Sequence, residues 1–241
     1  HGTKKVVEAL LAEGEVIDHC VVGEPTSAES FGDMVKVGRR GSINAEIVVE
    51  GVQGHVAYPH RAANPVPVLV RLLAALQDRR LDDGYPEFQP SNLEVTMIDV
   101  PNTATNVIPG VARARLNIRF NPNHTGQALA DWIAAEAAKA AEGFRGKVTV
   151  IPSISGEAFL TERGAFTDLV AAAIRDVTGA EPELSTSGGT SDARFIRALC
   201  PVVEVGLVGR TMHQVDERAP VDEIRRLQAV YGRILERYFA A

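Results

Sequence analysis

Hydrophobic and polar residues alternate along most of the chain between residues 39 and 151. Alternation with a period of two is typical of strands that bury one face. It predicts strands over residues 43–49, 93–97, 112–120 and 148–150. Two other stretches, which begin at Asn64-Pro65 and around Leu129, carry apolar residues at helical spacing instead. The order strand, helix, strand, strand, helix, strand predicts an α+β sandwich with two helices on one face of an antiparallel sheet.

A different pattern surrounds this region, because helices alternate there with short apolar strands. Helices are expected over residues 2–14, 166–177 and 192–199 and from Pro220 onward, and strands over 16–22, 34–37 and 202–205. This alternation is typical of a parallel or mixed sheet with helices on both sides. We therefore expect an α/β domain, made of residues 1–38 and 152–241, that is interrupted by a lid domain of residues 39–151.

The composition, with 45% hydrophobic and 23% charged residues, is ordinary for a globular protein. A formal net charge of −6 without a long run of lysine or arginine gives no electrostatic support for a nucleic-acid partner. The apolar stretches are too short to cross a bilayer. Cys20 and Cys200 each lie beside an apolar run and are expected to be buried thiols, which is compatible with a reducing cytoplasm. The chain starts in what reads as a helix already under way, so we expect it to be part of a longer protein.

Two residues that follow predicted strands are candidate metal ligands. Glu24 lies in Val-Gly-Glu-Pro-Thr-Ser, just past the strand that ends at Val22, and ligands bind at that edge of open α/β sheets. His213 lies in Thr-Met-His-Gln-Val-Asp-Glu, where Asp216 or Glu217 could orient a ring nitrogen. A solvated turn carboxylate and an exposed loop histidine are the alternative interpretations of Glu24 and His213.

Glycine-rich polar loops supply further candidates. His55 stands in Gly-Val-Gln-Gly-His-Val-Ala-Tyr-Pro-His, where the glycines permit close backbone approach. The run Gly188–Asp192 leads into a helix, and free N–H groups there suit a carboxylate, with a plain helix cap at Ser191 or Asp192 as the alternative. Candidate carboxylate clamps, each with a surface role as the alternative, are Arg39, Arg119 and Arg194.

Taken in order along the chain, these motifs resemble the bacterial succinyl-diaminopimelate desuccinylases, a family of zinc-dependent amidohydrolases. The series comprises Val-Gly-Glu-Pro-Thr-Ser, Gly-Arg-Arg-Gly-Ser, Gly-His-Val-Ala-Tyr-Pro-His, Thr-Asn-Val-Ile-Pro, Gly-Gly-Thr-Ser-Asp-Ala-Arg-Phe and Met-His-Gln-Val-Asp-Glu. The resemblance implies hydrolysis of N-succinyl-LL-2,6-diaminopimelate to succinate and LL-diaminopimelate, a step in lysine and cell-wall precursor synthesis. It also implies a cytoplasmic homodimer, joined through the lid domain, with two zinc or cobalt ions.

The same resemblance implies roles for individual residues. Glu24 matches a carboxylate ligand of one zinc ion, and His213 matches the imidazole ligand of the other. His55 matches a lid histidine that reaches the partner subunit's active site and stabilises the tetrahedral oxyanion. The positions that hold the carboxylates and polar groups of the substrate are matched by Arg39, Ser42, Tyr58, Asn106, Arg119, Gly189 and Thr190.

The other ligands that the resemblance implies, a first histidine, a bridging aspartate and paired glutamates, have no counterpart in this sequence. Each zinc would keep one protein ligand, and a single ligand holds zinc weakly. We therefore expect that the chain by itself binds no zinc tightly and hydrolyses nothing, and that the activity belongs to a longer parent. The alternatives are a related acyl-amino-acid amidohydrolase, such as an acetylornithine deacetylase or a carboxypeptidase, and a non-catalytic dimerisation module.

Overall fold

The computed structural model describes residues 2–240 and divides the chain into two compact units. Unit 1 comprises the chain up to Arg39 and again from Phe159 onward, and unit 2 comprises Arg40–Ala158. The expected domain boundary at residue 151 falls inside a strand that continues to Gly156, so the second unit extends further than the hydrophobic pattern indicated. No helix among the described residues is both long and apolar enough to span a membrane.

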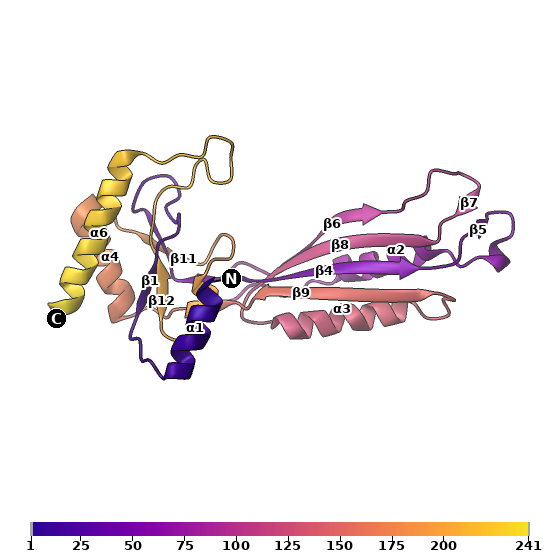
Figure 1. Ribbon diagram of the computed structural model, residues 1–241, viewed down its shortest axis with the longest axis horizontal. Coiled ribbons are helices and arrows are strands. Elements are labelled where there is room, and N and C mark those ends of the chain that lie inside the picture. The colour runs from indigo at the N-terminus through magenta and orange to yellow at the C-terminus, as the bar shows by residue number, and fades with distance from the viewer. Residues whose placement is uncertain (1, 241) are drawn as a thin grey trace. The chain divides into compact units, whose positions relative to one another are not determined.

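Unit 2 is a four-stranded antiparallel sheet in the order β6-β8-β4-β9, with a two-stranded ribbon, β5-β7, at one end of it (Figure 1). Its two long helices pack on the sheet, which confirms the predicted α+β sandwich. The elements are β4 (Gly41–Glu50), β5 (Gly54–His55), the 3-10 helix η1 (Pro59–Arg61), α2 (Pro65–Asp78), β6 (Asn92–Asp99), β7 (Val107–Ile108), β8 (Val111–Phe120), α3 (Gly126–Ala140) and β9 (Lys147–Gly156).

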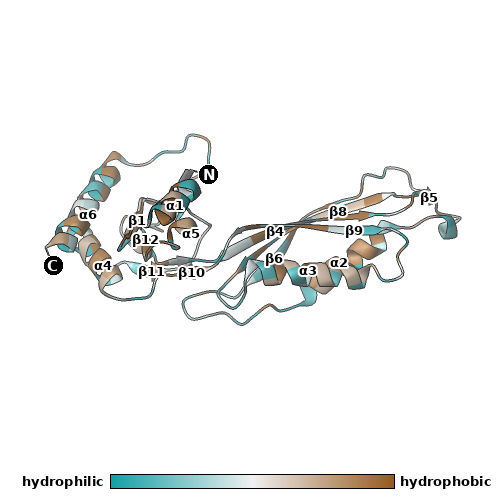
Figure 2. Ribbon diagram, turned by 60° about the horizontal axis from the view of Figure 1, so that its bottom comes forward, coloured by the Kyte–Doolittle hydropathy of each residue, from teal (hydrophilic) through white to brown (hydrophobic). Residues whose placement is uncertain are grey.

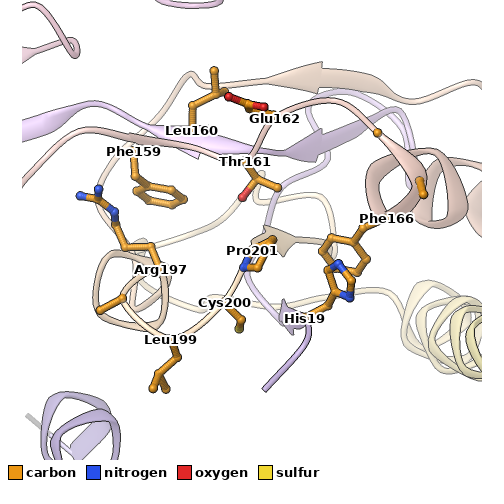
Figure 3. Close-up of a pocket in the computed structure, with 13 residues that line it drawn as sticks. His19, Phe159, Leu160, Thr161, Glu162, Phe166, Arg197, Leu199, Cys200 and Pro201 are labelled. Atoms are coloured by element: carbon orange, nitrogen blue, oxygen red, sulfur yellow. The ribbon is translucent and has the colours of Figure 1, made fainter. Parts of the chain in front are cut away.

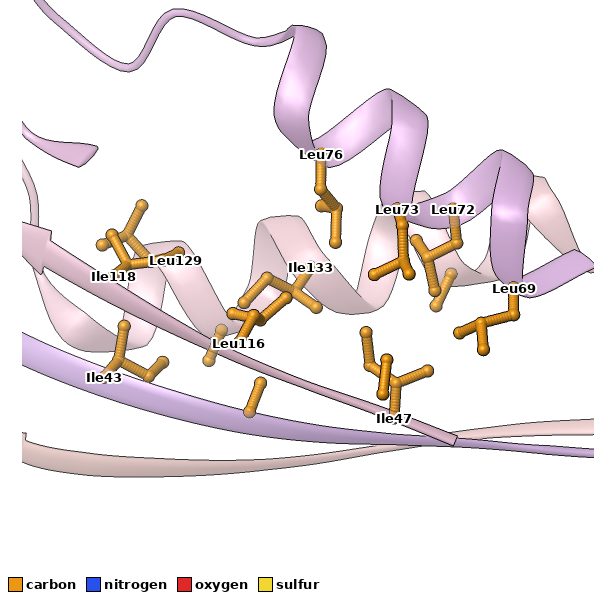
Figure 4. Packing of buried hydrophobic residues seen from close by; sticks show 14 of the residues in the cluster. Ile43, Ile47, Leu69, Leu72, Leu73, Leu76, Leu116, Ile118, Leu129 and Ile133 are labelled. Atoms are coloured by element: carbon orange, nitrogen blue, oxygen red, sulfur yellow. The ribbon is translucent and has the colours of Figure 1, made fainter. Parts of the chain in front are cut away.

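The period-two pattern decides which face of this sheet is buried. Ile43 lies opposite Ile118, and Ile47 lies opposite Ala114, so that their side chains share one face. Figure 4 shows the isoleucines of β4 and the leucines of α2 directed into one apolar layer. The helix side chains buried there include Leu69, Leu72, Leu76, Leu129 and Ile133. Burial of each such side chain contributes about 1.5–3 kcal/mol, so this layer is the main source of stability of unit 2.

Unit 1 is built around a mixed four-stranded sheet in the order β1-β12-β2-β11. β1 is parallel to β12, β12 is antiparallel to β2, and β2 is parallel to β11. A short ribbon, β3-β10, completes the strands. The elements are α1 (Gly2–Glu13), β1 (Cys20–Val22), β2 (Met34–Lys36), β3 (Gly38–Arg39), β10 (Phe159–Leu160), α4 (Ala165–Thr178), β11 (Glu183–Ser185), α5 (Ala193–Ile196), β12 (Val202–Glu204) and α6 (Val221–Phe239).

Helices cover both faces of this sheet, as predicted. Val203 on β12 is buried in a cluster with residues of α4 and α6, whereas its neighbour Val202 is buried with Ala193 of α5. Since successive strand residues point to opposite faces, α4 and α6 lie on one side of β12 and α5 lies on the other. Brown and teal residues alternate along α4 and α6 in Figure 2, as expected for helices with one buried face.

Two local expectations were wrong. The strand expected over residues 16–22 is only Cys20–Val22, because Val16 is 87% exposed and has no layer to pack against. The helix expected over residues 192–199 contains only Ala193–Ile196. The helical termini were predicted better: α2 is capped by Asn64, whose side chain accepts a hydrogen bond from Val66 N at 3.1 Å.

Candidate functional site

Three of the residues expected at the substrate lie together in the β5–β7 ribbon of unit 2. His55 pairs with Val107 across the ribbon. The amide of Val56 donates to the carbonyl of Asn106 at 3.1 Å, and the amide of Tyr58 donates to the carbonyl of His55 at 2.9 Å. The ribbon therefore brings His55, Tyr58 and Asn106 into one cluster, although about fifty residues separate the last from the first two.

Two glycines make the tight course of this loop possible. A side-chain carbon on Gly51 would lie 2.0 Å from the carbonyl oxygen of Ala63, and one on Gly54 would lie 2.8 Å from the Cβ of Ala62. Any larger residue would therefore push the loop away from the segment it crosses. The close backbone approach predicted from the glycines is confirmed.

The imidazole of His55 has a defined tautomer in this loop. Its Nδ1 lies 3.1 Å from the amide nitrogen of Ala57, and an amide N–H can only donate, so Nδ1 must accept. The proton of the neutral ring is then on Nε2, which becomes a hydrogen-bond donor. The His55 side chain is exposed, so this N–H is accessible to an anionic group.

Ser42 and Arg119 are direct cross-strand neighbours on β4 and β8. Asn117 connects them, because its amide nitrogen donates to Ser42 Oγ at 3.2 Å and its amide oxygen accepts from Arg119 Nε at 3.1 Å. Asn117 was not among the predicted site residues, although its position two residues before Arg119 places it on the same face of β8.

Arg40 adds a second guanidinium close to Arg119. Burial, followed by the positive charge of Arg119, lowers the pKa of Arg40. Its Nη1 donates to Asn92 Oδ1 at 3.0 Å. Two guanidinium groups close enough for their charges to repel favour the binding of a carboxylate. The Arg-Arg dipeptide was the available signal for Arg40.

Glu24 stands after β1 in unit 1, as expected, and is partly buried. Burial raises the pKa of its carboxyl group, the charges of Glu204 and Asp192 raise it further, and the charge of Arg39 opposes them. Gly206 allows the close approach of this turn, because a side-chain carbon there would lie 2.0 Å from the carbonyl oxygen of Glu24. Burial and the negative charges of Glu204 and Asp192 therefore disfavour the ionised form of Glu24, in part offset by Arg39.

Arg39 is buried, which contradicts the alternative that it is a surface arginine. Its Nε lies 3.1 Å from each carboxylate oxygen of Glu204, and Nη2 also contacts Glu204. Glu204 is only 1% exposed. The carboxylate nearest to Arg39 is thus one of this chain's own, and no sequence signal singled out Glu204, which follows two valines in an apolar strand.

Gly189 and Thr190 lie in the connection between β11 and α5. Gly189 is exposed and Thr190 is partly buried. Asp192 occupies the N-cap position of α5 but makes no side-chain capping bond, and the Ser191 hydroxyl contacts Glu204, so neither residue is the plain helix cap considered above. Arg194, the third candidate clamp, lies with its guanidinium carbon 4.6 Å from the Phe195 ring centroid.

His213 is exposed in the long loop before α6 and has a φ of 63°, in the left-handed region. Its backbone amide, rather than its ring, lies 3.3 Å from Glu217 Oε2, so the expected orientation of the ring by this carboxylate is not observed. Within residues 2–240, no group of three or more His, Cys, Asp or Glu side chains is placed to hold a metal ion. Since zinc requires three or four ligands, these residues do not form a complete zinc site by themselves.

A cavity of about 640 Å³ in unit 1 contains none of the predicted site residues (Figure 3). His19 lines it, stacked on Phe166 at 4.2 Å between ring centroids, with its Nδ1 2.7 Å from the Tyr238 hydroxyl. Cys200 also lines it, and burial raises the pKa of this thiol to about 11. An imidazole that is stacked and hydrogen-bonded, beside a thiol that stays protonated, indicates a structural role for both groups.

Comparison with known proteins places these features in context. Residues 37–145 match a family model described as a peptidase dimerisation domain. The chain is 92% identical over 240 residues to a succinyl-diaminopimelate desuccinylase of Phenylobacterium zucineum, and the match covers the whole chain but 63% of that relative's length.

Solved structures share the fold at much lower identity. The chain is similar to the aminopeptidase PepT of Bacillus cereus, with a TM-score of 0.79 and 19% identity over 98% of this chain and 61% of that one. It is also similar to a dinuclear metal binding peptidase of the M20 family from Bacillus subtilis, with a TM-score of 0.67 and 17% identity over 98% of this chain and 61% of that one.

Proposed function

We propose that this chain, which is 92% identical to a succinyl-diaminopimelate desuccinylase, is part of an enzyme that hydrolyses the amide bond of N-succinyl-LL-2,6-diaminopimelate. The products would be succinate and LL-diaminopimelate. The observation that carries the proposal is the 92% identity, which runs through the entire chain and not through one domain alone. As the chain spans less than two thirds of that relative, the activity is proposed for a longer protein that contains it.

The succinylated substrate carries carboxylates, and the positively charged side chains at one end of β4 and β8 could bind them. Arg119 and Ser42, joined through Asn117, face the same region as Arg40. We assign to Arg119 and Ser42 the binding of a substrate carboxylate, with Arg40 as an additional donor. Tyr58 and Asn106 lie with His55 in the ribbon, at the opposite end of β4 from Ser42, and would bind polar groups of a substrate held by the partner subunit. Gly189 and Thr190 in unit 1 would bind another polar group of the substrate. Such contacts hold the scissile amide in one orientation.

His55 would stabilise the oxyanion that develops when the amide carbonyl is attacked. The hydrogen bond from Ala57 to Nδ1 keeps the proton on Nε2, so the neutral ring donates without first gaining a proton. A fixed donor of this kind is most valuable in the transition state, where the carbonyl oxygen acquires its charge.

A pair of zinc or cobalt ions would supply an activated water and polarise the carbonyl. One structure similar to this chain is described as a dinuclear metal binding peptidase, which supports metal use in the family. Glu24, partly buried among acidic groups, and His213, on an exposed loop, would each supply one ligand. The remaining ligands would have to come from residues outside this chain, because the described residues contain no set of three.

The enzyme would be a cytoplasmic homodimer that associates through unit 2, which contains most of the matched dimerisation domain. Two edges of the sheet, β6 and β9, are available for a second copy. β9 contains Pro152, which lacks an N–H donor, whereas β6 contains no proline. Ile98 of β6 and Val70 of α2 are both exposed, and together they line a cavity of about 570 Å³. We therefore assign the contact to β6 and α2.

A chimera tests the proposed activity. This chain would replace the matching 240 residues of the Phenylobacterium zucineum relative, and turnover of N-succinyl-LL-2,6-diaminopimelate would be measured with zinc present. We expect turnover close to that of the relative. His55→Ala should lower kcat by a factor of about 10²–10³, the usual effect of removing one oxyanion donor.

His60→Ala is the matched control, because His60 is also an exposed histidine and lies in η1, directly after the same loop. It should leave kcat within about twofold of the unsubstituted chimera. A chimera that cleaves N-acetylornithine but not the succinylated substrate would replace the proposal with the deacetylase alternative. A folded, metal-loaded chimera that cleaves neither would support a non-catalytic module.

A further inference from the structure

The ion pair between Arg39 and Glu204 is connected to both ends of the segment Ser187–Ser191. At one end, Arg39 Nη1 donates to the carbonyl oxygen of Ser187 at 3.0 Å. At the other end, the Ser191 hydroxyl donates to Glu204 Oε1. Ser187 and Ser191, four positions apart, are therefore hydrogen-bonded to the arginine and the glutamate of one ion pair. The segment between them is closed into a loop of fixed width.

Lys36 strengthens the first of these attachments. Its ammonium group donates to Ser187 Oγ at 2.7 Å and to Ser185 Oγ at 3.4 Å. Lys36 is directly opposite Glu204 in the pairing of β2 with β12. Lys36 and Glu204 therefore stand on adjacent strands of the sheet of unit 1, and Arg39 stands on β3 of the short β3-β10 ribbon, so each attachment point belongs to a strand.

Burial makes this arrangement unusual. Arg39, Glu204, Lys36 and Ser191 are all no more than 8% exposed. Removing charges from water costs several kcal/mol per ion, and apolar residues of similar size often give equal or greater stability. Stability alone is therefore a poor reason for placing an arginine, a glutamate and a lysine here. A role in fixing one conformation is the better-supported explanation.

Gly188 shows how closely the loop follows the guanidinium. It has a φ of +99°, and a side-chain carbon at this position would lie 2.5 Å from Arg39 Nη1. Only glycine satisfies both constraints without displacing the arginine. By contrast, a side-chain carbon on Gly189 would meet nothing within 4 Å, so the next residue faces open space.

We infer that Lys36, Arg39 and Glu204 are positioning residues that hold Gly189 and Thr190 in place for a polar group of the substrate. In this inference, which rests on the proposed function, Arg39 and Glu204 act on the loop through their contacts with Ser187 and Ser191. Gly189 and Thr190 lie between the two attached residues, Ser187 and Ser191. An anion or carbonyl of the substrate binds to the backbone of Gly189 and Thr190 and to the Thr190 hydroxyl, and the loop is already ordered before it binds.

Ser191→Ala tests the inference with a minimal change, because it removes the link to Glu204 and leaves the ion pair intact. In the chain itself, hydrogen exchange measured by mass spectrometry should become at least about tenfold faster across residues 188–190, with no change in β2 or β12. In the chimera, KM for the succinylated substrate should rise about tenfold while kcat changes less. Ser191→Thr keeps a hydroxyl and should restore both values.

Thr167→Ala is the matched control. Thr167 is a buried hydroxyl residue of unit 1 that caps α4, and its hydrogen bonds are to Gly164. Thr167→Ala should leave both the hydrogen-exchange rate of residues 188–190 and the KM for the succinylated substrate unchanged. If Ser191→Ala fails to fold, Ser187→Ala removes the Lys36 contact at the other end and should give the same two effects.

The inference is overturned if the loop exchanges at the same rate in Ser191→Ala as in the unsubstituted chain, or if Ser191→Thr does not restore it. Because exchange is measured on the chain alone, this result does not depend on activity. An inactive chimera would count against the proposed function. The exchange result would still decide whether Lys36, Arg39 and Glu204 hold the loop in place.

Discussion

Asp82 is the residue on which the connection between α2 and β6 depends. Its Oδ1 accepts from the amides of Gly84 and Ser91 at 2.7 and 3.2 Å and from Asn121 Nδ2 at 2.7 Å, and its Oδ2 lies 2.9 Å from His124 Nε2. Burial alone would raise the pKa of Asp82, but the hydrogen bonds from Ser91, Gly84 and Asn121 outweigh it and lower the pKa to about 2 from an ordinary 3.8. The sequence analysis missed this group, since Asn121 and His124 are about forty residues further along the chain.

Replacing Asp82 should destabilise unit 2 in a pH-dependent way. Asp82→Asn loses the charge and leaves donors unpaired, so the free energy of unfolding at pH 7 should fall by about 2 kcal/mol. Because the folded-state pKa is depressed, the stabilisation is present above about pH 4 and is lost as the pH falls from 4 to 2. The difference between variant and unsubstituted chain should therefore shrink over that interval.

Fluorescence of Trp132 during urea unfolding measures this effect, because Trp132 is the single tryptophan of the chain and lies on α3. Asp99→Asn serves as the control, since Asp99 is exposed and its nearest arginine nitrogen, on Arg113, is 3.9 Å away. Its effect should stay below about 0.5 kcal/mol. Equal losses for the two variants would refute the role given to Asp82.

At the scale of elements, α2 illustrates what periodicity predicts well. The leucines at helical spacing after Asn64-Pro65 predicted a helix, and the same leucines are the buried face of α2. The short strands of unit 1 were harder to place, because a run of apolar residues does not say how much of it is paired. In the run that ends at Val22, only the last three residues find a partner strand, β12.

Leu72→Ala should cost about 2–5 kcal/mol in the stability of unit 2, because Leu72 is fully buried between α2 and the sheet and its removal leaves a cavity. The same Trp132 fluorescence measurement detects the loss. Asp78→Ala, an exposed position at the end of the same helix, should change stability by less than about 0.5 kcal/mol. A small effect at Leu72 would mean that the α2 layer contributes little.

At the scale of the whole molecule, the proposed dimer depends on the β6 edge and α2 of unit 2. Sedimentation velocity should find the chain as a dimer, and Ile98→Lys should convert it to a monomer, since it places a charge beside the β6 edge where the second copy would pair. Ile151→Lys provides the control on the opposite edge, β9, with a similarly exposed isoleucine. A dimer that survives Ile98→Lys but not Ile151→Lys would move the interface to β9.

Both kinds of fold could be predicted from the amino-acid sequence alone. Alternation with a period of two is a local property, so it identified the sheet of unit 2 and its buried face without knowledge of any distant contact. The ordered motifs likewise indicated a resemblance to the succinyl-diaminopimelate desuccinylases before any geometry was known.

Which charged and polar groups neutralise or orient one another could be seen only in the folded chain. Arg39 and Glu204 are 165 residues apart, and an apolar strand gave no reason to expect a glutamate as the partner of that arginine. The link from Ser42 through Asn117 to Arg119 and the attachment of Ser187–Ser191 to Arg39 and Glu204 both depend on atoms of separate elements brought within about 3 Å by packing. The physical reason is that periodicity reports which face of an element is buried, whereas the partner on that face is chosen by how separate elements pack.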